Sequence, residues 1–445
     1  MPKRKSRAYY QYMLDVTDQK VGYYSSDDIS LIAYDLLDEG DEQEALAACQ
    51  KGLDQHPGDE FILIIKAKVL ARMHRFDECE RLLQGNPDEH SPFGISIRFA
   101  LDIHRYGSHH ALTLLLDDLD KQHLLPIEVI DIIDEYLEDI DNADVCLPLQ
   151  QIAAKLHNPQ SADDSQTSEL LGRIGALLMD SSNHRQAIPV LERALDIDAY
   201  DIYSWQDLAR CQLDLHLFDQ CEQSCEMGLA IDPTNPLFNF ALGFIQCEKQ
   251  QYAEAIPHLE LMRQYAEGNV RHENINLDKQ ESEQRRNLTY ELLGNAYQAV
   301  GNLDKAIECY EVLIRCLPYF SEGHHRLALL LIERGDNQAA LRHVTSAIEA
   351  EPDNSTYRAL RATLHTELGD YDQALADLDR LIEHNPRSKT FLLAKAELSL
   401  SLKRFNEADM AYRSLLKLHP KDETSRSLLR AYFEAIGDDE ALKKL

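Results

Sequence analysis

Four prolines in the C-terminal part of the chain are separated by the same interval. Pro318, Pro352, Pro386 and Pro420 lie 34 residues apart, and each closes a stretch such as GDYDQALADLDRLIEHNP (369–386). Each stretch has a turn residue, an apolar pattern with helical spacing, and then the proline, which ends one helix and opens the next. A period of this length is typical of a helix–turn–helix unit that repeats along the chain.

The positions within one repeat have distinct physical roles. Counted from the start of a unit, positions 8 and 20 carry small residues, so that two antiparallel helices can approach closely. Positions 4, 7, 11, 17 and 24 carry large apolar residues, which fill the space between neighbouring units. One unit cannot bury its apolar face alone, so stacking is needed to form a continuous core. The residues that follow this pattern best are Trp205, Leu208, Ala209, Pro233, Gly294, Tyr297, Ala306, Tyr310 and Pro318.

This pattern resembles the tetratricopeptide repeat family, and the resemblance covers most of residues 26–445. It implies an all-α, right-handed superhelical solenoid of about eleven 34-residue units with a C-terminal cap. It also implies a non-catalytic protein–protein interaction scaffold or adaptor, which binds a peptide or a partner helix on its concave face. The alternative is a regulatory protein whose repeat array changes curvature when it binds a ligand or peptide.

The period also predicts how the chain is divided. We expect a solvated basic tail (1–25), N-terminal helical repeats (26–156, degenerate after about 93), a polar linker (157–167), central repeats (168–269), a charged insertion (270–286) and C-terminal repeats with capping helices (287–445). The insertion is expected to lengthen the first helix of the next unit, with Asp278 as its N-cap. The degenerate stretch either continues the array or forms a hinge.

The charge of the chain narrows the classes of partner. Its 445 residues include 77 acidic and 45 basic ones, which gives a formal net charge of −32. Such an excess repels nucleic-acid phosphates and anionic membrane surfaces, so we expect neither as a partner. The sequence contains no run of about 20 apolar residues that could span a bilayer. Nine cysteines without paired spacing favour a reducing, cytoplasmic location over a disulfide framework.

Motifs for catalysis or metal binding are not found. The sequence has no GxxxxGK[ST], GxGxxG, GxSxG, HExxH or CxxC pattern, so we expect no enzyme activity, no cofactor and no metal site. The strongest metal candidate is Cys221 with Cys225, since residues i and i+4 share one helix face. However, Cys221 occupies position 20, where other units have alanine, and packing as small buried hydrophobes is the preferred interpretation.

Family resemblance places the candidate partner-binding residues on the first helix of each unit, which lines the concave face. Phe240 and Phe244 are unusual on a solvated face, and an exposed apolar patch there would suit an extended peptide or a helix. The alternative is that the insertion helix or a neighbouring turn covers both rings. Acidic neighbours would select a neutral or basic partner. The candidate residues are Tyr203, Gln206, Arg210, Phe240, Phe244, Glu291, Asn295, Gln298 and His325.

Overall fold

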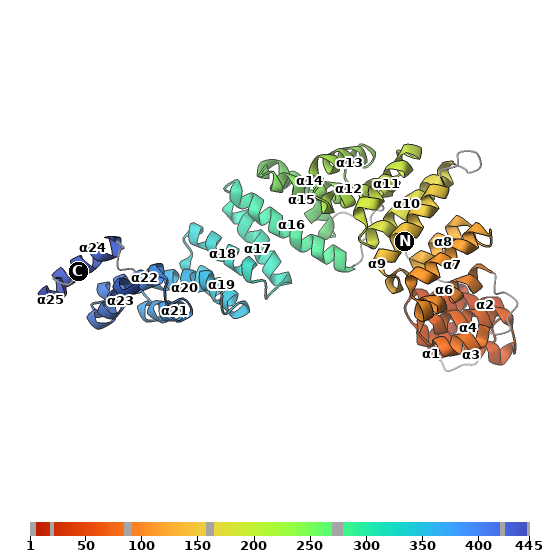
Figure 1. The fold of residues 1–445 in the computed structure, drawn as a ribbon, viewed down its shortest axis with the longest axis horizontal. Coiled ribbons are helices and arrows are strands. Elements are labelled where there is room, and N and C mark those ends of the chain that lie inside the picture. The colour runs from red at the N-terminus through yellow and green to blue at the C-terminus, as the bar shows by residue number, and fades with distance from the viewer. Residues whose placement is uncertain are drawn as a thin grey trace. The chain divides into compact units, whose positions relative to one another are not determined.

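A computed structural model describes residues 6–17, 22–83, 91–156, 164–268, 279–418 and 423–442. Within these ranges the secondary structure is helical, with one 3₁₀ turn at Leu137–Asp139 and no β-strand. Figure 1 shows the helices following one another in pairs along the chain. The predicted all-α architecture of stacked helix pairs is therefore confirmed. The chain forms two compact units, Met1–Asp232 and Pro233–Leu445.

In the first unit, α1 (Arg7–Thr17) precedes a series of helix pairs. The pairs are α2 (Ser26–Asp38) with α3 (Glu42–Gln55), α4 (Glu60–Arg72) with α5 (Phe76–Leu83), α6 (Pro92–Tyr106) with α7 (Ser108–Asp120), α8 (Pro126–Glu135) with α9 (Asn142–Lys155), α10 (Asp164–Asp180) with α11 (His184–Ile197), and α12 (Ile202–Asp214) with α13 (Phe218–Ile231).

The second unit has the same construction. Its pairs are α14 (Pro236–Glu248) with α15 (Tyr252–Ala266), α16 (Lys279–Ala299) with α17 (Leu303–Cys316), α18 (Ser321–Arg334) with α19 (Asn337–Ala350), α20 (Ser355–Leu368) with α21 (Tyr371–His384), and α22 (Lys389–Ser401) with α23 (Phe405–Leu418), followed by α24 (Glu423–Ile436) and α25 (Asp439–Leu442). The first helices α12, α14, α18, α20 and α22 begin at the residues where the 34-residue period starts a new unit.

The turn residues explain why the paired helices end where they do. Gly335 and Gly369 end α18 and α20 with φ angles of +89° and +83°, a left-handed conformation that glycine adopts without steric cost. Asp336 then caps α19, because its carboxylate accepts a hydrogen bond from the Ala339 amide at 3.0 Å. Two consecutive residues therefore stop one helix and start the next.

Small residues bring the two helices of a pair together, as the repeat pattern predicts. A Cβ atom on Gly294 of α16 would lie 2.6 Å from Cε2 of Tyr310 on α17. A Cβ on Gly175 of α10 would lie 2.4 Å from Cδ2 of Leu191 on α11. Both distances are shorter than non-bonded carbon atoms tolerate, so at these positions the large partner side chain requires a glycine opposite it.

The degenerate stretch packs as part of the array in the first unit. One hydrophobic core runs from Ile64 on α4 to Cys211 on α12, and it includes Ile97 on α6, Ile133 on α8 and Ile152 on α9. Each of these three isoleucines is fully buried. Helices α6–α9 therefore continue the stack between the more regular repeats on either side.

The N-terminal segment differs from its prediction as a solvated tail. Residues 7–17 form α1, and Tyr9 and Tyr12 on this helix are 7% and 2% exposed. The Tyr12 hydroxyl donates a hydrogen bond to Oε1 of Glu44 at 3.0 Å, and the Tyr9 hydroxyl donates one to Glu39. The prediction was wrong because tyrosines three residues apart give α1 an apolar face that packs on α2. The basic cluster Lys3–Lys5 lies outside the described residues.

The predicted linker and the predicted insertion each contain the first residue of a helix. Helix α10 begins at Asp164, inside the linker predicted for residues 157–167, and residues 157–163 lie outside the described ranges. The insertion at 270–286 lengthens a first helix as expected, because α16 starts at Lys279 and continues to Ala299. Asp278, the predicted N-cap of this helix, also lies outside the described residues.

Candidate functional site

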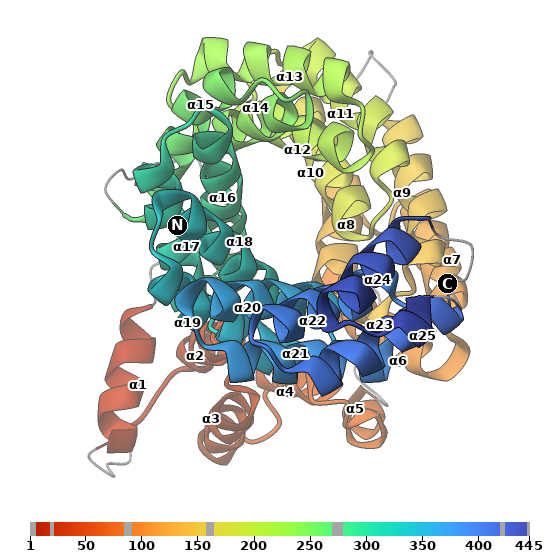
Figure 2. The same cartoon turned by 90° about the vertical axis from the view of Figure 1, so that its left-hand side faces the viewer.

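The first helices of the second unit form one side of its stack. Figure 2 shows α14, α16, α18 and α20 next to one another, with their partners α15, α17, α19 and α21 on the other side. We call the surface made by α14, α16, α18 and α20 the first-helix face. It carries most of the residues that the repeat pattern marks as candidates for partner binding.

Phe240 and Phe244 do not form an exposed patch, which was one of the two arrangements that the sequence left open. Phe240 is only 4% exposed and belongs to the hydrophobic core of the second unit, while Phe244 is half-buried and packs against that core. The guanidinium carbon of Arg285 lies 5.6 Å from the centroid of the Phe240 ring, a cation–π distance. Arg285 is on the extension of α16, so the insertion helix covers the Phe240 ring, as the alternative prediction expected.

A polar cluster connects the neighbouring helices α18 and α20. Glu322 on α18 accepts a hydrogen bond from Nε of Arg326 at 2.6 Å, and its second oxygen accepts one from the Tyr357 hydroxyl on α20 at 3.3 Å. Nδ1 of His325 lies 3.5 Å from that second oxygen, and the His325 and Tyr357 rings have centroids 4.9 Å apart. With Glu291 on α16, these residues make up what we call the Glu322 cluster.

The two carboxylates of this cluster have different electrostatic environments. Burial opposes ionisation of Glu322, but the hydrogen bond and the charge of Arg326 outweigh it and lower the pKa of Glu322 below its usual value. For Glu291, burial raises the pKa, the Glu322 charge raises it further, and Arg326 opposes the shift. One arginine therefore serves two carboxylates, which leaves the cluster with an attraction for an additional cation.

Asn295 and Gln298 lie further along α16. Asn295 accepts a hydrogen bond at Oδ1 from the Tyr310 hydroxyl on α17, at 2.8 Å. This bond orients the amide so that its NH₂ group is left for other acceptors. Gln298 is half-buried, and none of the contacts in the described ranges joins it to the Glu322 cluster. Of the predicted residues in the second unit, His325 therefore contacts Glu322 and Tyr357, and Glu291 is near enough to feel the charges of Glu322 and Arg326.

The remaining candidates belong to the first unit. Tyr203, Gln206 and Arg210 follow one face of α12, and Tyr203 is 53% exposed. Between them, burial raises the pKa of Asp207 to about 7, and the nearby charge of Asp180 adds to the shift while Arg210 opposes it. These residues form a separate group on the first unit.

The sequence analysis did not predict a cluster in the first unit in which aromatic rings surround the ammonium group of Lys68. Nζ of Lys68 on α4 lies 5.5 Å from the ring centroid of Tyr34 on α2 and 5.7 Å from that of Phe93 on α6. The same ammonium group is 3.0 Å from Oε1 of Glu135 on α8. Tyr34 and Lys68 both occupy position 9 of their units, and this shared position was the signal that could have located the cluster.

The cysteine pair predicted to pack in the core does so. Cys221 and Cys225 are fully buried, their sulfur atoms are 4.0 Å apart, and the Cys221 thiol donates to the carbonyl of Ala209. In the part of the chain that the structure describes, no group of three or more His, Cys, Asp and Glu side chains is placed to hold a metal ion. None of the described helices combines the length and hydropathy needed to cross a bilayer.

Comparison with known proteins places these helix pairs in a family. Models of the tetratricopeptide repeat match residues 178–242, 289–318, 325–370 and 359–423. The BBSome complex member BBS4 of Bos taurus is 36% identical over 78 residues, which are 18% of this chain; the match spans 15% of the length of that relative.

Two solved structures are similar in fold. YrrB, described as a tetratricopeptide repeat protein with an unusual peptide-binding site, is 15% identical with a TM-score of 0.39, covering 46% of this chain and 97% of its own. PilF of Pseudomonas aeruginosa is 20% identical with a TM-score of 0.39, covering 53% of this chain and 99% of its own. The matched family models and the repeated helix pairs show that residues 178–242, 289–318 and 325–423 are tetratricopeptide repeats.

Proposed function

We propose that the chain is a non-catalytic scaffold that binds a peptide or a partner helix on the first-helix face of its second unit. Tetratricopeptide repeats are protein–protein interaction modules, which supports the general role. The observation that carries the specific proposal is the Glu322 cluster, because it links side chains of α18 and α20 at an accessible surface. Its hydrogen bonds fix the polar groups before a partner arrives, which reduces the entropy lost on binding.

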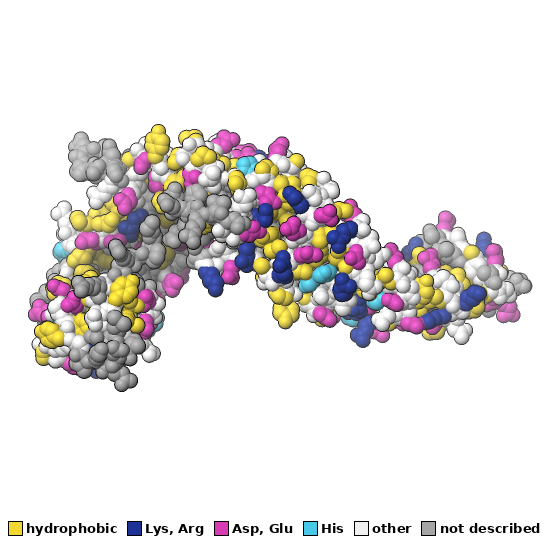
Figure 3. Space-filling model, turned by 180° about the vertical axis from the view of Figure 1, so that it is seen from behind, with side chains coloured by type: hydrophobic (Ala, Val, Ile, Leu, Met, Phe, Trp, Pro, Cys, Tyr) yellow, Lys and Arg dark blue, Asp and Glu magenta, His cyan; other side chains and the backbone are white. Residues whose placement is uncertain are grey.

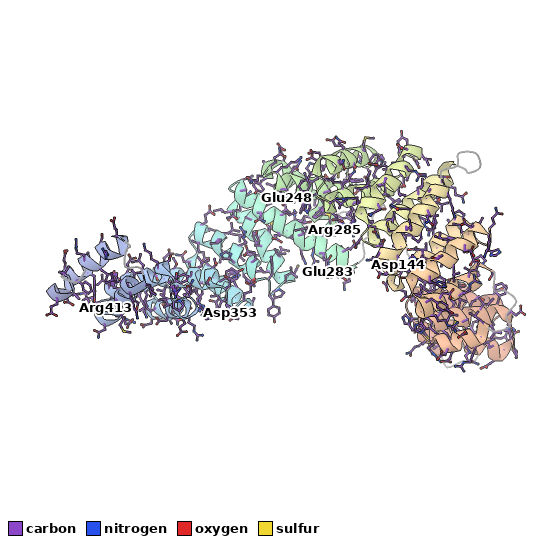
Figure 4. All side chains as sticks on the ribbon, in the orientation of Figure 1. Asp144, Glu248, Glu283, Arg285, Asp353 and Arg413 are labelled. Atoms are coloured by element: carbon purple, nitrogen blue, oxygen red, sulfur yellow. The ribbon has the colours of Figure 1, made fainter. Side chains whose placement is uncertain are left out.

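The chemistry of this face favours a neutral or basic partner with apolar side chains. Leu329 and Ile332 on α18 and Leu360 on α20 are half-buried and could be covered further by a ligand. Glu248 at the end of α14 and Glu283 near the start of α16, both labelled in Figure 4, are exposed. On the side of the second unit that is seen in Figure 3, basic, acidic and apolar side chains are intermixed. Such a mixed surface suits a short peptide segment.

The proposed contacts follow from the geometry. A lysine or arginine of the peptide would pair with Glu291 and Glu322, which share the single guanidinium of Arg326. The NH₂ group of Asn295 would donate to a peptide carbonyl, because its oxygen already accepts from Tyr310. Apolar burial against α18 and α20 would then add to the affinity.

Selection of peptides from a displayed random library tests the proposal. We expect wild-type protein to enrich sequences with basic and apolar residues, and the Glu291→Gln/Glu322→Gln variant to bind the enriched peptides at least tenfold more weakly. Glu333→Gln is the matched control, because Glu333 is an exposed carboxylate on the same helix α18. Equal affinity of wild type and the double variant for every enriched peptide would exclude the Glu322 cluster as the binding site.

We extend the proposal to location and to the alternative function. Each of the nine cysteines lies in the described ranges as a free thiol, which supports a reducing compartment such as the cytoplasm. A regulatory role through changing curvature stays a prediction, and small-angle X-ray scattering with a selected peptide tests it. A change in the radius of gyration would favour the regulator, and an unchanged value the passive scaffold.

A further inference from the structure

A groove lies on the first unit between the second helices α11 and α13, above the first helix α12. Its volume is about 460 Å³, which falls within the range of about 300–1,000 Å³ usual for ligand pockets. Leu195 of α11, Trp205 and Leu208 of α12 and Met227 of α13 give it an apolar lining. It is therefore distinct from the first-helix face of the second unit, both in the helices used and in the unit that carries it.

The corresponding groove of the second unit is filled by the chain's own side chains. Between α15 and α17, above α16, Tyr290 and Tyr297 occupy positions 4 and 11 of their unit. The Tyr297 hydroxyl donates to Glu260 at 2.7 Å, and the Tyr290 hydroxyl donates to Glu267. The space left there is about 130 Å³. The repeat geometry therefore does not by itself produce a large groove.

The groove in the first unit is open because of the residues at the same positions. Position 11 is Gln212, whose Oε1 accepts a hydrogen bond from the Ser224 hydroxyl at 2.7 Å. Both side chains are buried and folded against each other, so neither extends into the space that a tyrosine would fill. Trp205 at position 4 is held in place, because its Nε1 donates to the carbonyl of Ala199 at 3.0 Å.

The open groove leaves apolar and acidic groups accessible. Met227 is 50% exposed on the α13 side, and a thioether next to an indole is an adaptable surface for an aliphatic side chain. On the α11 side, Glu192 and Asp196 are exposed and one turn apart. No described ion pair involves either of these two carboxylates, and the sequence of α13 contains no lysine or arginine. The rim is therefore negative beside an apolar floor.

We propose that this groove is a second docking site, which takes a short helical segment of a partner protein that presents leucine-type side chains next to lysines. The aliphatic side chain would be buried against Trp205 and Met227, and the neighbouring cations would pair with Glu192 and Asp196. The site is independent of the proposed function of the second unit, because it shares none of its residues.

Fluorescence provides the test, because Trp205 is the only tryptophan of the chain. The full-length protein is titrated with a synthetic amphipathic helical peptide of leucine and lysine. We expect a saturable change in Trp205 emission, at least tenfold weaker binding in Met227→Lys, and at least threefold weaker binding in Glu192→Gln/Asp196→Asn. Met410→Lys, which changes another exposed methionine on α23, is the matched control and should bind like wild type.

Two comparisons separate the groove from general attraction to an acidic protein. A lysine–serine peptide of the same charge should leave Trp205 emission unchanged, and the Glu291→Gln/Glu322→Gln variant should bind the leucine–lysine peptide like wild type. The proposal is overturned if the emission does not saturate, if the lysine–serine peptide acts equally, or if Met227→Lys and Met227→Ala, each with wild-type helicity, both bind as wild type does.

Discussion

Single residues in this array are constrained mainly by the helix that packs against them. Gly294 faces the ring of Tyr310, and Gly175 faces Leu191, so each glycine is required by the size of its partner. Gly369 is different, because a Cβ atom there would have no heavy atom within 4 Å. The glycine at this position is explained by its φ of +83°, not by a close neighbour. Steric and conformational demands can therefore be tested separately on these glycines.

Replacing Gly294 by alanine should destabilise the second unit by about 1–3 kcal/mol, since the new methyl group would overlap the Tyr310 ring. Gly369→Ala should cost about 1 kcal/mol through its backbone conformation alone. Urea unfolding of both variants measures the difference. If Gly294→Ala is as stable as wild type, the Tyr310 ring moves aside and the contact does not determine the residue.

Asp207 gives the stability of the first unit a pH dependence. Burial raises its pKa from 3.8 to about 7, so between these values the folded protein binds more protons at this carboxyl than the unfolded chain does. The free energy of unfolding should therefore fall as the pH rises from about 4 to 7, and stay low above that.

The Asp207→Asn variant isolates this effect. We expect it to be more stable than wild type by about 2–4 kcal/mol at pH 8 and similar to wild type at pH 4, because only the ionised aspartate is penalised by burial. Chemical unfolding at a series of pH values measures it. A difference between the two proteins that stays constant from pH 4 to pH 8 would show that Asp207 titrates normally.

At the scale of helices, each element depends on what covers its apolar face. Helix α1 covers α2 and α3 through tyrosines, while α20 and α21 are joined by a buried ion pair. Asp377 on α21 is 4% exposed and accepts two hydrogen bonds from Arg361 on α20, at 2.8 and 2.6 Å. Apolar and ionic interfaces thus occur in the same array, and they should respond differently to substitution.

Tyr12→Ala should destabilise the N-terminal repeat by about 3–4 kcal/mol. Tyr12 is buried, donates a hydrogen bond to Glu44 and packs edge-on against Tyr24. Since repeats contact only their neighbours, hydrogen exchange should accelerate in α1–α3 and stay unchanged in α10–α13. Tyr10→Ala is the control on the same helix, because Tyr10 is 56% exposed. Faster exchange throughout the first unit would contradict a local effect.

Asp377→Ala should cost about 3–5 kcal/mol, because it leaves Arg361 without its carboxylate in a buried setting. Asp379 lies on α21 like Asp377, but it is an exposed partner of Lys395 on α22. Asp379→Ala should therefore lower the free energy of unfolding by about 1 kcal/mol or less. The two free energies of unfolding are compared in urea. Similar losses in both variants would mean that burial does not distinguish these ion pairs.

At the scale of the whole molecule, each unit has a core of its own. The main core of the first unit is built from residues between Ile64 and Cys211, and that of the second from residues between Phe240 and Leu364. We therefore expect unfolding in more than one transition. Trp205 emission reports on the first unit, and circular dichroism reports on all helices, so the two urea curves should have different midpoints. Coincident curves would indicate one cooperative transition.

The sequence predicted the fold in detail because the repeat positions are set by local packing. Helices such as α12, α18 and α20 start where the period places them, since small and large residues must alternate in register. Helix α1 was missed because it lies outside the period. For Phe240 the sequence left an exposed patch and a covering insertion helix both open, because its cover, Arg285, comes from another helix. The partners of Glu322 depend on side-chain geometry between helices, which a single sequence does not record.

Helix α1 also has a consequence for how copies of this protein would meet. A stack of repeats that ends in an uncovered apolar face offers a surface on which the far end of another copy can continue the stack, and such head-to-tail association leads to filaments. In this chain α1 covers that surface with Tyr9 and Tyr12, whose hydroxyls donate hydrogen bonds to Glu39 and Glu44. Removal of α1 would therefore turn a closed end into a site for polymerisation.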